Sequence, residues 1–143
     1  MNLLSDLLHI ITNISWAADI SATLVAMIIG YIWYHPSVFG TVWARVANLS
    51  PESINSVRAK NGFLYTLPIT FVIAANITAF CKHLEYTDPA RAFLIGYDLG
   101  LIACLILAIH FLYEQRNFTH YAITAGYVLV SMGAMGLVIG VVL

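Results

Sequence analysis

Residues 89–143 decide the fold, and they read PARAFLIGYDLGLIACLILAIHFLYEQRNFTHYAITAGYVLVSMGAMGLVIGVVL. They contain two apolar runs, at 89–113 and 120–143, separated by the short polar segment 114–119. Each run has the roughly 20 residues that an α-helix needs to cross the hydrocarbon core of a bilayer. Because the connecting segment is so short, the two helices must be antiparallel neighbours.

Two further apolar runs of similar length lie earlier in the chain, at about 17–34 and 62–81. Only 9% of the 143 residues are charged, whereas a soluble domain carries about 25%. The mean hydropathy is +0.87. We therefore predict an all-α membrane protein, a four-transmembrane-helix bundle forming one integral-membrane domain over residues 1–143. This composition excludes a soluble enzyme and a disordered regulator. Six basic residues against seven acidic ones also exclude a nucleic-acid-binding surface.

Two shorter segments, 3–14 and 38–49, have helical amphipathic patterns but are too short to span a bilayer. We predict that both are interfacial helices lying at the membrane surface. For segment 3–14, an extension of the first membrane helix is an equally good interpretation. Trp16 and Trp33 bracket the first span, as aromatic residues at the two membrane interfaces do.

The distribution of basic residues predicts the orientation in the membrane. The first and third loops contain Arg45, Arg58, Lys60 and Arg116, whereas the second loop contains Lys82 and Arg91. Cytoplasmic loops carry the excess of Lys and Arg. We therefore expect the first and third loops in the cytoplasm and both termini outside.

Glycine spacing predicts how the last two spans pack, because small residues allow membrane helices to approach closely. The predicted packing residues are Gly96 and Gly100 in the third span and Gly126, Gly133, Gly136 and Gly140 in the fourth. In an antiparallel pair, Gly96 and Gly100 lie at the depth of Gly136 and Gly140. We expect a tight crossing there, and favour packing within one subunit over a dimer interface.

Three polar residues fall in the outer half of the predicted bundle: Asp98, Asn76 and Asp19. Asp98 and Asn76 lie at nearly the same depth, so we expect a hydrogen bond between them, with Asp98 protonated. Asp19 is expected closer to the outer surface. The favoured role of these groups is to hold helices together. The alternative is a proton-coupling carboxylate of the kind that small four-span exporters use.

A second polar set lies near the predicted cytoplasmic boundary: His35, His110, Glu114 and His120. Imidazole and carboxylate groups can bind zinc, but the compact His-Glu-x-x-His motif is absent from the sequence. A structural role is therefore favoured, and we expect no metal and no cofactor. There is no second histidine pair for a haem, and no Gly-x-Ser-x-Gly or Ser-x-x-Lys motif for nucleophilic catalysis. No catalytic residue is assigned.

The sequence Trp33-Tyr34-His35-Pro36 ends the first span, because Pro36 disfavours helical geometry at His35. The favoured interpretation is an architectural corner. Trp33-Tyr34-x-Pro36 followed by Phe39-Gly40 and Trp43 resembles the hallmark of a bacterial four-span family, domain of unknown function 1761 (DUF1761). Glu114-x-Arg116 and Ala125-Gly126-Tyr127 agree with that family.

The resemblance covers essentially the whole chain. It implies a small polytopic protein of the bacterial inner membrane without an assigned activity, so no functional residues carry over. His35 occupies a position that is often Ser or Asn in the family, which argues against a shared metal ligand.

Three functions are compatible with the sequence. The favoured one is a self-assembling or accessory, binding membrane protein whose partners are the lipid bilayer and a second copy or a larger membrane complex, without nucleic acid. The alternative is a small oligomeric proton-coupled solute or ion transporter that uses Asp98 or Asp19, with Pro68 loosening the second span. The third and least favoured is a membrane enzyme using the His/Glu set at the cytoplasmic boundary.

Overall fold

The computed structural model describes residues 15–54 and 57–143, and every regular element in these ranges is helical. The elements are α2 (Trp16–Trp33), the π-helix η1 (Pro36–Gly40), α3 (Thr41–Val46), α4 (Pro51–Ile54), α5 (Val57–His83), α6 (Pro89–Tyr113) and α7 (Phe118–Val142). The predicted surface helix at 3–14 lies outside the described residues.

Four of the described helices contain stretches long and apolar enough to cross a membrane: Trp16–Trp33, Leu64–His83, Pro89–Tyr113 and Phe118–Val142. The predicted all-α membrane bundle is confirmed. Of the second predicted surface segment, 38–49, residues 38–46 are helical in η1 and α3, and α3 ends at Val46.

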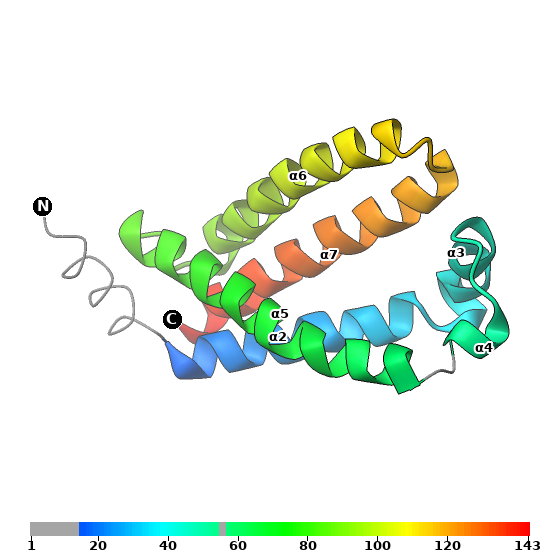
Figure 1. Cartoon of the computed structure of the whole chain (residues 1–143). Helices are drawn as coiled ribbons and strands as arrows, with labels where there is room; N and C mark the ends of the chain where they lie inside the picture. The colour runs from blue at the N-terminus through cyan, green and yellow to red at the C-terminus, as the bar shows by residue number, and fades with distance from the viewer. Residues whose placement is uncertain (1–14, 55–56) are drawn as a thin grey trace, which may run out of the picture.

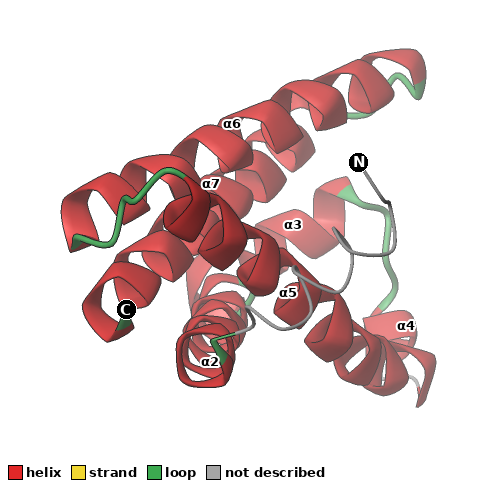
Figure 2. Ribbon diagram, turned by 90° about the vertical axis from the view of Figure 1, so that its left-hand side faces the viewer, coloured by secondary structure: helices red, strands yellow, loops and turns green. Residues whose placement is uncertain are grey.

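Helix α7 is the centre of the bundle. It packs along α6 as an antiparallel hairpin and also contacts α2, α5 and α3 (Figure 1). A view nearly along α2 shows α7 between α2 and α6 (Figure 2). Helix α5 packs mainly against α2. The predicted antiparallel pairing of the last two spans therefore forms the main contact of the fold.

The two ends of the bundle differ in what they bury. We call the end where α2 and α6 begin and α5 and α7 finish the core end. Its buried residues are mostly small: Ala18, Ala22 and Ala26 of α2, Ala74, Ile77 and Cys81 of α5, Ala92 of α6, and Met135 and Ile139 of α7. We call the opposite end, which carries η1, α3 and the α6–α7 loop, the corner end.

The α6–α7 hairpin is packed so tightly that backbone meets backbone. A Cβ atom built at Gly96 would lie 2.1 Å from the Met132 carbonyl oxygen. One built at Gly136 would lie 2.2 Å from the carbonyl oxygen of Ala92. No side chain fits at either position, so these glycines set the distance between the two helices.

Not every glycine of α7 belongs to this seam. Gly126 faces α2 instead, where an added Cβ would lie 3.0 Å from the Trp33 ring. Cys104 and Tyr121 also join the two helices: the Cys104 thiol donates to the Ala125 carbonyl, and the Tyr121 hydroxyl donates to the Cys104 carbonyl. Glycine contacts thus dominate near the core end and hydrogen bonds nearer the corner end.

Local sequence explains where the hairpin turns. The Asp88 side chain accepts a hydrogen bond from the Arg91 backbone N–H and caps α6, with Pro89 at the first helical position. After α6, Gln115 adopts the left-handed conformation at φ 52°, and the Arg116 N–H donates to the Phe111 carbonyl. Asn117 then caps α7 by accepting from the Thr119 N–H.

Candidate functional site

Asp19 is the buried carboxyl group of the core end. It lies in the first turn of α2 and its side chain is fully buried. Its Oδ1 accepts a hydrogen bond of 2.6 Å from the Thr78 hydroxyl of α5, while its Oδ2 is buried without a hydrogen-bond partner. Burying a carboxylate oxygen without a partner is costly, and a bound proton removes most of that cost. The site therefore suits the binding of a proton.

The surroundings of Asp19 are tightly packed and apolar. Thr23, one turn along α2, donates its hydroxyl to the Asp19 backbone carbonyl at 2.7 Å. Ala18 and Ala22 on the same helix belong to the core that Ile77 of α5 and Ile139 of α7 complete. Sequence reasoning gave Asp19 only a depth, close to the outer membrane surface, and the structure adds that its side chain is buried between helices. Its spacing of three from Ala22 and seven from Ala26 already puts it on the small-residue face that packs.

Asp98, in contrast, lies on the outside of the bundle. Its side chain is exposed on α6, and in the described part of the chain it has no hydrogen-bond or ion-pair partner. The expected hydrogen bond between Asp98 and Asn76 is not formed. Asn76 is also exposed, and its side-chain amide donates to the Val72 carbonyl of its own helix at 2.7 Å. The reason is that α6 packs mainly on α7, so the two polar groups face outward from different helices.

Large apolar side chains surround Asp98. The Asp98 face of α6 consists of Leu94, Tyr97, Asp98, Leu101, Ile102 and Leu105, all exposed. Asp98 follows Pro89 by nine positions, which at about 1.5 Å per residue is about 14 Å along the helix. That is close to the middle of a hydrocarbon core about 30 Å thick. The Asp98 carboxyl group is thus exposed near the middle of a helix that is long enough to cross a membrane.

The four polar residues expected at the cytoplasmic boundary do not form one cluster. His120 is buried, with its ring against those of Phe111 and Trp43, at centroid distances of 4.9 Å and 6.0 Å. His35 is exposed and its ring contacts Ser37.

His110 and Glu114 are also exposed, and Glu114 forms an ion pair with Arg116. Helix α7 meets α6 along the side of Cys104 and Phe111, so His110 and Glu114 remain on the outer surface. Over residues 15–54 and 57–143, no group of three or more His, Cys, Asp or Glu side chains is arranged to hold a metal ion. The proposed site for a lipid-modifying enzyme is therefore not assembled.

The Trp-Tyr-His-Pro segment forms an aromatic corner on the first half of α7. We define the aromatic corner as Trp33, Tyr34, Phe39, Trp43, His120 and Tyr127. The indole N–H of Trp33 donates to the Ile123 carbonyl at 3.1 Å, and its ring packs on Phe39. Tyr34 lies between Trp43 and Tyr127, with centroid distances of 5.1 Å and 5.3 Å. The motif therefore joins the end of α2 and the surface helix α3 to α7.

Gly40 is essential to this corner for a steric reason. A Cβ atom at Gly40 would lie 2.1 Å from the Tyr34 carbonyl oxygen, so the π-helical turn closes only around glycine. Thr41 supports the turn by donating its hydroxyl to the Pro36 carbonyl. Burial in the aromatic corner raises the pKa of the Tyr34 phenol from 10.0 to about 12. The nearby Tyr127 adds to this shift and a hydrogen bond with Thr124 opposes it.

Comparison with known proteins adds the family but no activity. A family model described as "Protein of unknown function (DUF1761)" matches residues 18–140. No curated protein and no solved structure matches the chain.

Proposed function

The chain belongs to the DUF1761 family, whose description assigns no function. From the geometry of the chain, we propose that it is a self-assembling protein of the bacterial inner membrane. The observation that carries this proposal is the exposed carboxyl group of Asp98 on a wholly apolar helix face. In this proposal the Asp98 face of α6 packs against the same face of a second copy.

The energetic argument concerns the cost of Asp98 in lipid. A charged aspartate at the centre of a membrane helix costs roughly 2.5–3.5 kcal/mol on insertion scales. In a two-fold symmetric pair, the same residue from each copy approaches the axis, so two Asp98 side chains can share a proton in a hydrogen bond. Leu94, Leu101 and Leu105 then supply the packing surface around that bond.

Disulfide cross-linking in membranes tests this interface. In a background with Cys81→Ala and Cys104→Ala, Ile102→Cys should give a cross-linked dimer, because Ile102 lies on the Asp98 face. The matched control is Ile69→Cys on α5, whose side chain is similarly exposed (60% against 54% for Ile102) but lies on another helix. A monomeric mass in detergent together with equal cross-linking of the two variants would contradict the proposal.

Replacement of Asp98 distinguishes the hydrogen bond from nonspecific association of the apolar surfaces. Asp98→Asn keeps a donor and an acceptor and should preserve the dimer. Asp98→Ala should weaken dimerisation about threefold to twentyfold, in line with the roughly 0.6–1.7 kcal/mol measured for interhelical hydrogen bonds in membranes. Equal dimerisation of the wild type and Asp98→Ala would show that the carboxyl group does not hold the interface.

A second candidate function is an oligomeric proton-coupled transporter of a small solute or ion. Asp19 supports it, because one of its oxygens is buried without a partner between α2 and α5. Pro68 also interrupts the hydrogen bonding of α5, which contacts α2. Proton uptake into proteoliposomes, followed with an enclosed pH dye under an imposed potential, tests this function. Asp19→Asn should abolish the uptake and Asp98→Asn should leave it unchanged. Uptake that matches protein-free vesicles would exclude this candidate.

The orientation in the membrane completes the proposal. Arg45 and Arg116 lie at the corner end, and the helix that starts with Val57 brings Arg58 and Lys60 to the same end. Lys82 and Arg91 lie at the core end. The excess of basic residues supports a cytoplasmic corner end, with the core end facing outward.

A further inference from the structure

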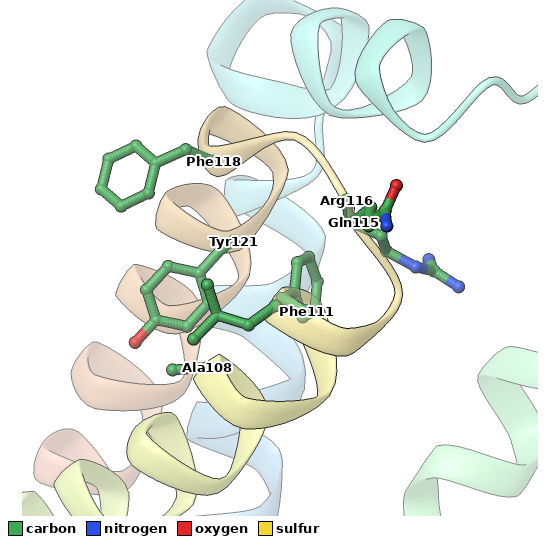
Figure 3. A pocket seen from close by; sticks show the side chains of 7 residues that line it. Ala108, Phe111, Gln115, Arg116, Phe118 and Tyr121 are labelled. Carbon is green, nitrogen blue, oxygen red and sulfur yellow. The ribbon is translucent and has the colours of Figure 1, made fainter.

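An apolar groove lies at the corner end, between the last turns of α6 and the first turns of α7. It has a volume of about 380 Å³, within the range of about 300–1,000 Å³ that small-molecule sites occupy. Its apolar walls are formed by Ala108, Phe111, Leu112, Phe118 and Tyr121, and its polar residues, Gln115 and Arg116, come from the connecting loop. Figure 3 shows Phe118 on one side of the groove and Gln115 and Arg116 on the other.

Arg116 places a positive charge beside the groove, and its guanidinium extends away from Phe118 and Tyr121 (Figure 3). Its guanidinium lies 5.7 Å from the centre of the Phe111 ring, and its side chain is about half exposed (49%). The ion pair with Glu114 contacts Nε of Arg116. A guanidinium has five N–H donors, so the two terminal amino groups provide four donors beyond Nε for an anion. This geometry suits a phosphate, which arginine binds with two parallel hydrogen bonds.

The groove is also at the right depth for a lipid. It adjoins the loop that ends two membrane-spanning helices, and Tyr113 and Phe118 beside it are 87% and 77% exposed. Aromatic rings at helix ends lie at the level of the lipid headgroups. A molecule in the groove would therefore have its polar end beside Arg116 and its apolar part against Phe111, Phe118 and Tyr121.

We propose that this groove binds one anionic phospholipid, with the phosphate on Arg116 and an acyl chain along the apolar walls. The occupant is a membrane lipid and not a free phosphate, because five of the seven lining residues are apolar or aromatic. The anionic headgroup is preferred because Arg116 provides the charge beside the groove. Glu114 competes with the phosphate for that charge and weakens the site.

Native mass spectrometry of the purified full chain tests the proposal by counting bound lipids. Phosphatidylglycerol, phosphatidylcholine, diacylglycerol and inorganic phosphate are added separately at equal concentrations. We expect one bound phosphatidylglycerol, retained about fivefold more tightly than phosphatidylcholine, because one basic residue near the headgroup contributes about that factor. Diacylglycerol should bind more weakly than phosphatidylglycerol, and phosphate alone should not bind.

Arg116→Gln should remove the preference for phosphatidylglycerol. The matched control is Arg91→Gln, because Arg91 has similar surroundings but does not line this groove: it pairs with Asp88 at 3.4 Å and lies 5.3 Å from the Tyr86 ring centre. That control should keep the preference. Equal lipid binding by the two variants, or equal retention of phosphatidylglycerol and phosphatidylcholine by the wild type, would overturn the proposal.

Two further variants give independent readouts. Glu114→Gln should strengthen phosphatidylglycerol binding, because it frees the guanidinium from its competing carboxylate; a purely structural role of Arg116 predicts no such gain. Ala108→Phe should fill the groove and reduce binding of both phospholipids. Unchanged binding in Ala108→Phe would show that the lipid is bound elsewhere on the surface and would also overturn the proposal.

Discussion

A single hydrogen bond between α5 and α2 stabilises the buried carboxyl group of Asp19. The Thr78 hydroxyl satisfies one carboxyl oxygen at 2.6 Å, the other oxygen has no hydrogen-bond partner, and Lys82 attracts the carboxyl group electrostatically. Pairs of this kind contribute asymmetrically: removing one partner leaves an unsatisfied group, whereas replacing both by apolar groups is nearly neutral. The site is therefore more sensitive to the loss of Thr78 than its modest net energy suggests.

Thr78→Val should lower the free energy of unfolding by about 1–3 kcal/mol, because both oxygens of Asp19 then lack a protein partner. The double variant Asp19→Leu/Thr78→Val should be less destabilised than Thr78→Val alone. Denaturation in mixed detergent micelles, followed by circular dichroism, measures both. Thr23→Val is the control, because the Thr23 hydroxyl is also buried but donates to the Asp19 backbone carbonyl of its own helix and not to the carboxyl group. A loss in this control as large as in Thr78→Val would contradict the assignment.

Tyr34 should make the fold sensitive to alkaline pH. Burial raises the pKa of this phenol from 10.0 to about 12 in the folded protein. Folding therefore favours the protonated phenol. The stability this provides is complete below about pH 10 and is lost as the pH rises towards 12. The ultraviolet absorbance of tyrosinate, compared between the wild type and Tyr34→Phe, should show one phenol that ionises at about pH 12. A difference titration centred near pH 10 would contradict this.

At the scale of secondary-structure elements, the α6–α7 hairpin is held by direct backbone contacts at its glycines. At both Gly96 and Gly136, a backbone carbonyl of the other helix occupies the space that a Cβ atom of this residue would need. Because lipid tails are as apolar as leucine, close packing has to supply the association energy of such helices. The hairpin therefore depends on a small number of positions where nothing but glycine fits.

Gly136→Ala should force α6 and α7 apart at Ala92 and destabilise the protein by about 1–3 kcal/mol or more, as overpacking does. Gly62→Ala is the matched control in α5, because nothing lies within 4 Å of a Cβ built there. It should gain roughly 0.5–1 kcal/mol from helix propensity. The same mixed-micelle denaturation compares the two. An unchanged midpoint for Gly136→Ala would show that the helices are farther apart than described here.

The predictability of these elements follows from the physics of the membrane. Hydropathy predicts the four spans well because crossing a bilayer requires a long apolar run. It misses the start of α5, which begins at Val57 whereas the predicted span begins at residue 62, since hydropathy detects lipid contact and not helical hydrogen bonding.

Hydropathy also cannot say which face of a span meets protein, because a helix between lipid and protein is apolar all round. That is why Asp98 was expected to be buried, although it is exposed on α6. The four polar residues near the corner end do not form one cluster for the same reason. His110 and Glu114 share one face of α6, whereas α7 packs on the face that carries Gly96, Gly100 and Cys104.

The described part of the molecule has a small core and a large exposed apolar surface. Most large apolar side chains of the described membrane helices are exposed, and the core is built mainly from alanine and glycine. A protein of this kind is stable only when lipid or a second copy covers its surface. Its orientation in the bilayer then decides which partners can reach each end.

Cysteine labelling should place the two loops of α6 on opposite sides of the membrane. In the background with Cys81→Ala and Cys104→Ala, Thr87→Cys at the core end should react with a membrane-impermeant maleimide added to intact cells. Asn117→Cys at the corner end should react only after the cells are permeabilised, because α6 spans the bilayer between the two positions. Equal reaction of both sites in intact cells would contradict the four-span fold, and the reverse pattern would invert the proposed orientation.

The bond between the Trp33 indole and the Ile123 carbonyl joins residues 90 positions apart. At the usual 5–20 residues per second, the ribosome needs on the order of ten seconds to make the intervening chain. During that time α2 has already been synthesised while its main partner, α7, does not yet exist. Until α7 is made, the Trp33 indole and the Tyr34 ring must therefore be held at the bilayer surface or by α5 alone. Assembly of the corner is thus a late event in biogenesis, and a ribosome that stalls before α7 would leave the first helix without its main packing partner.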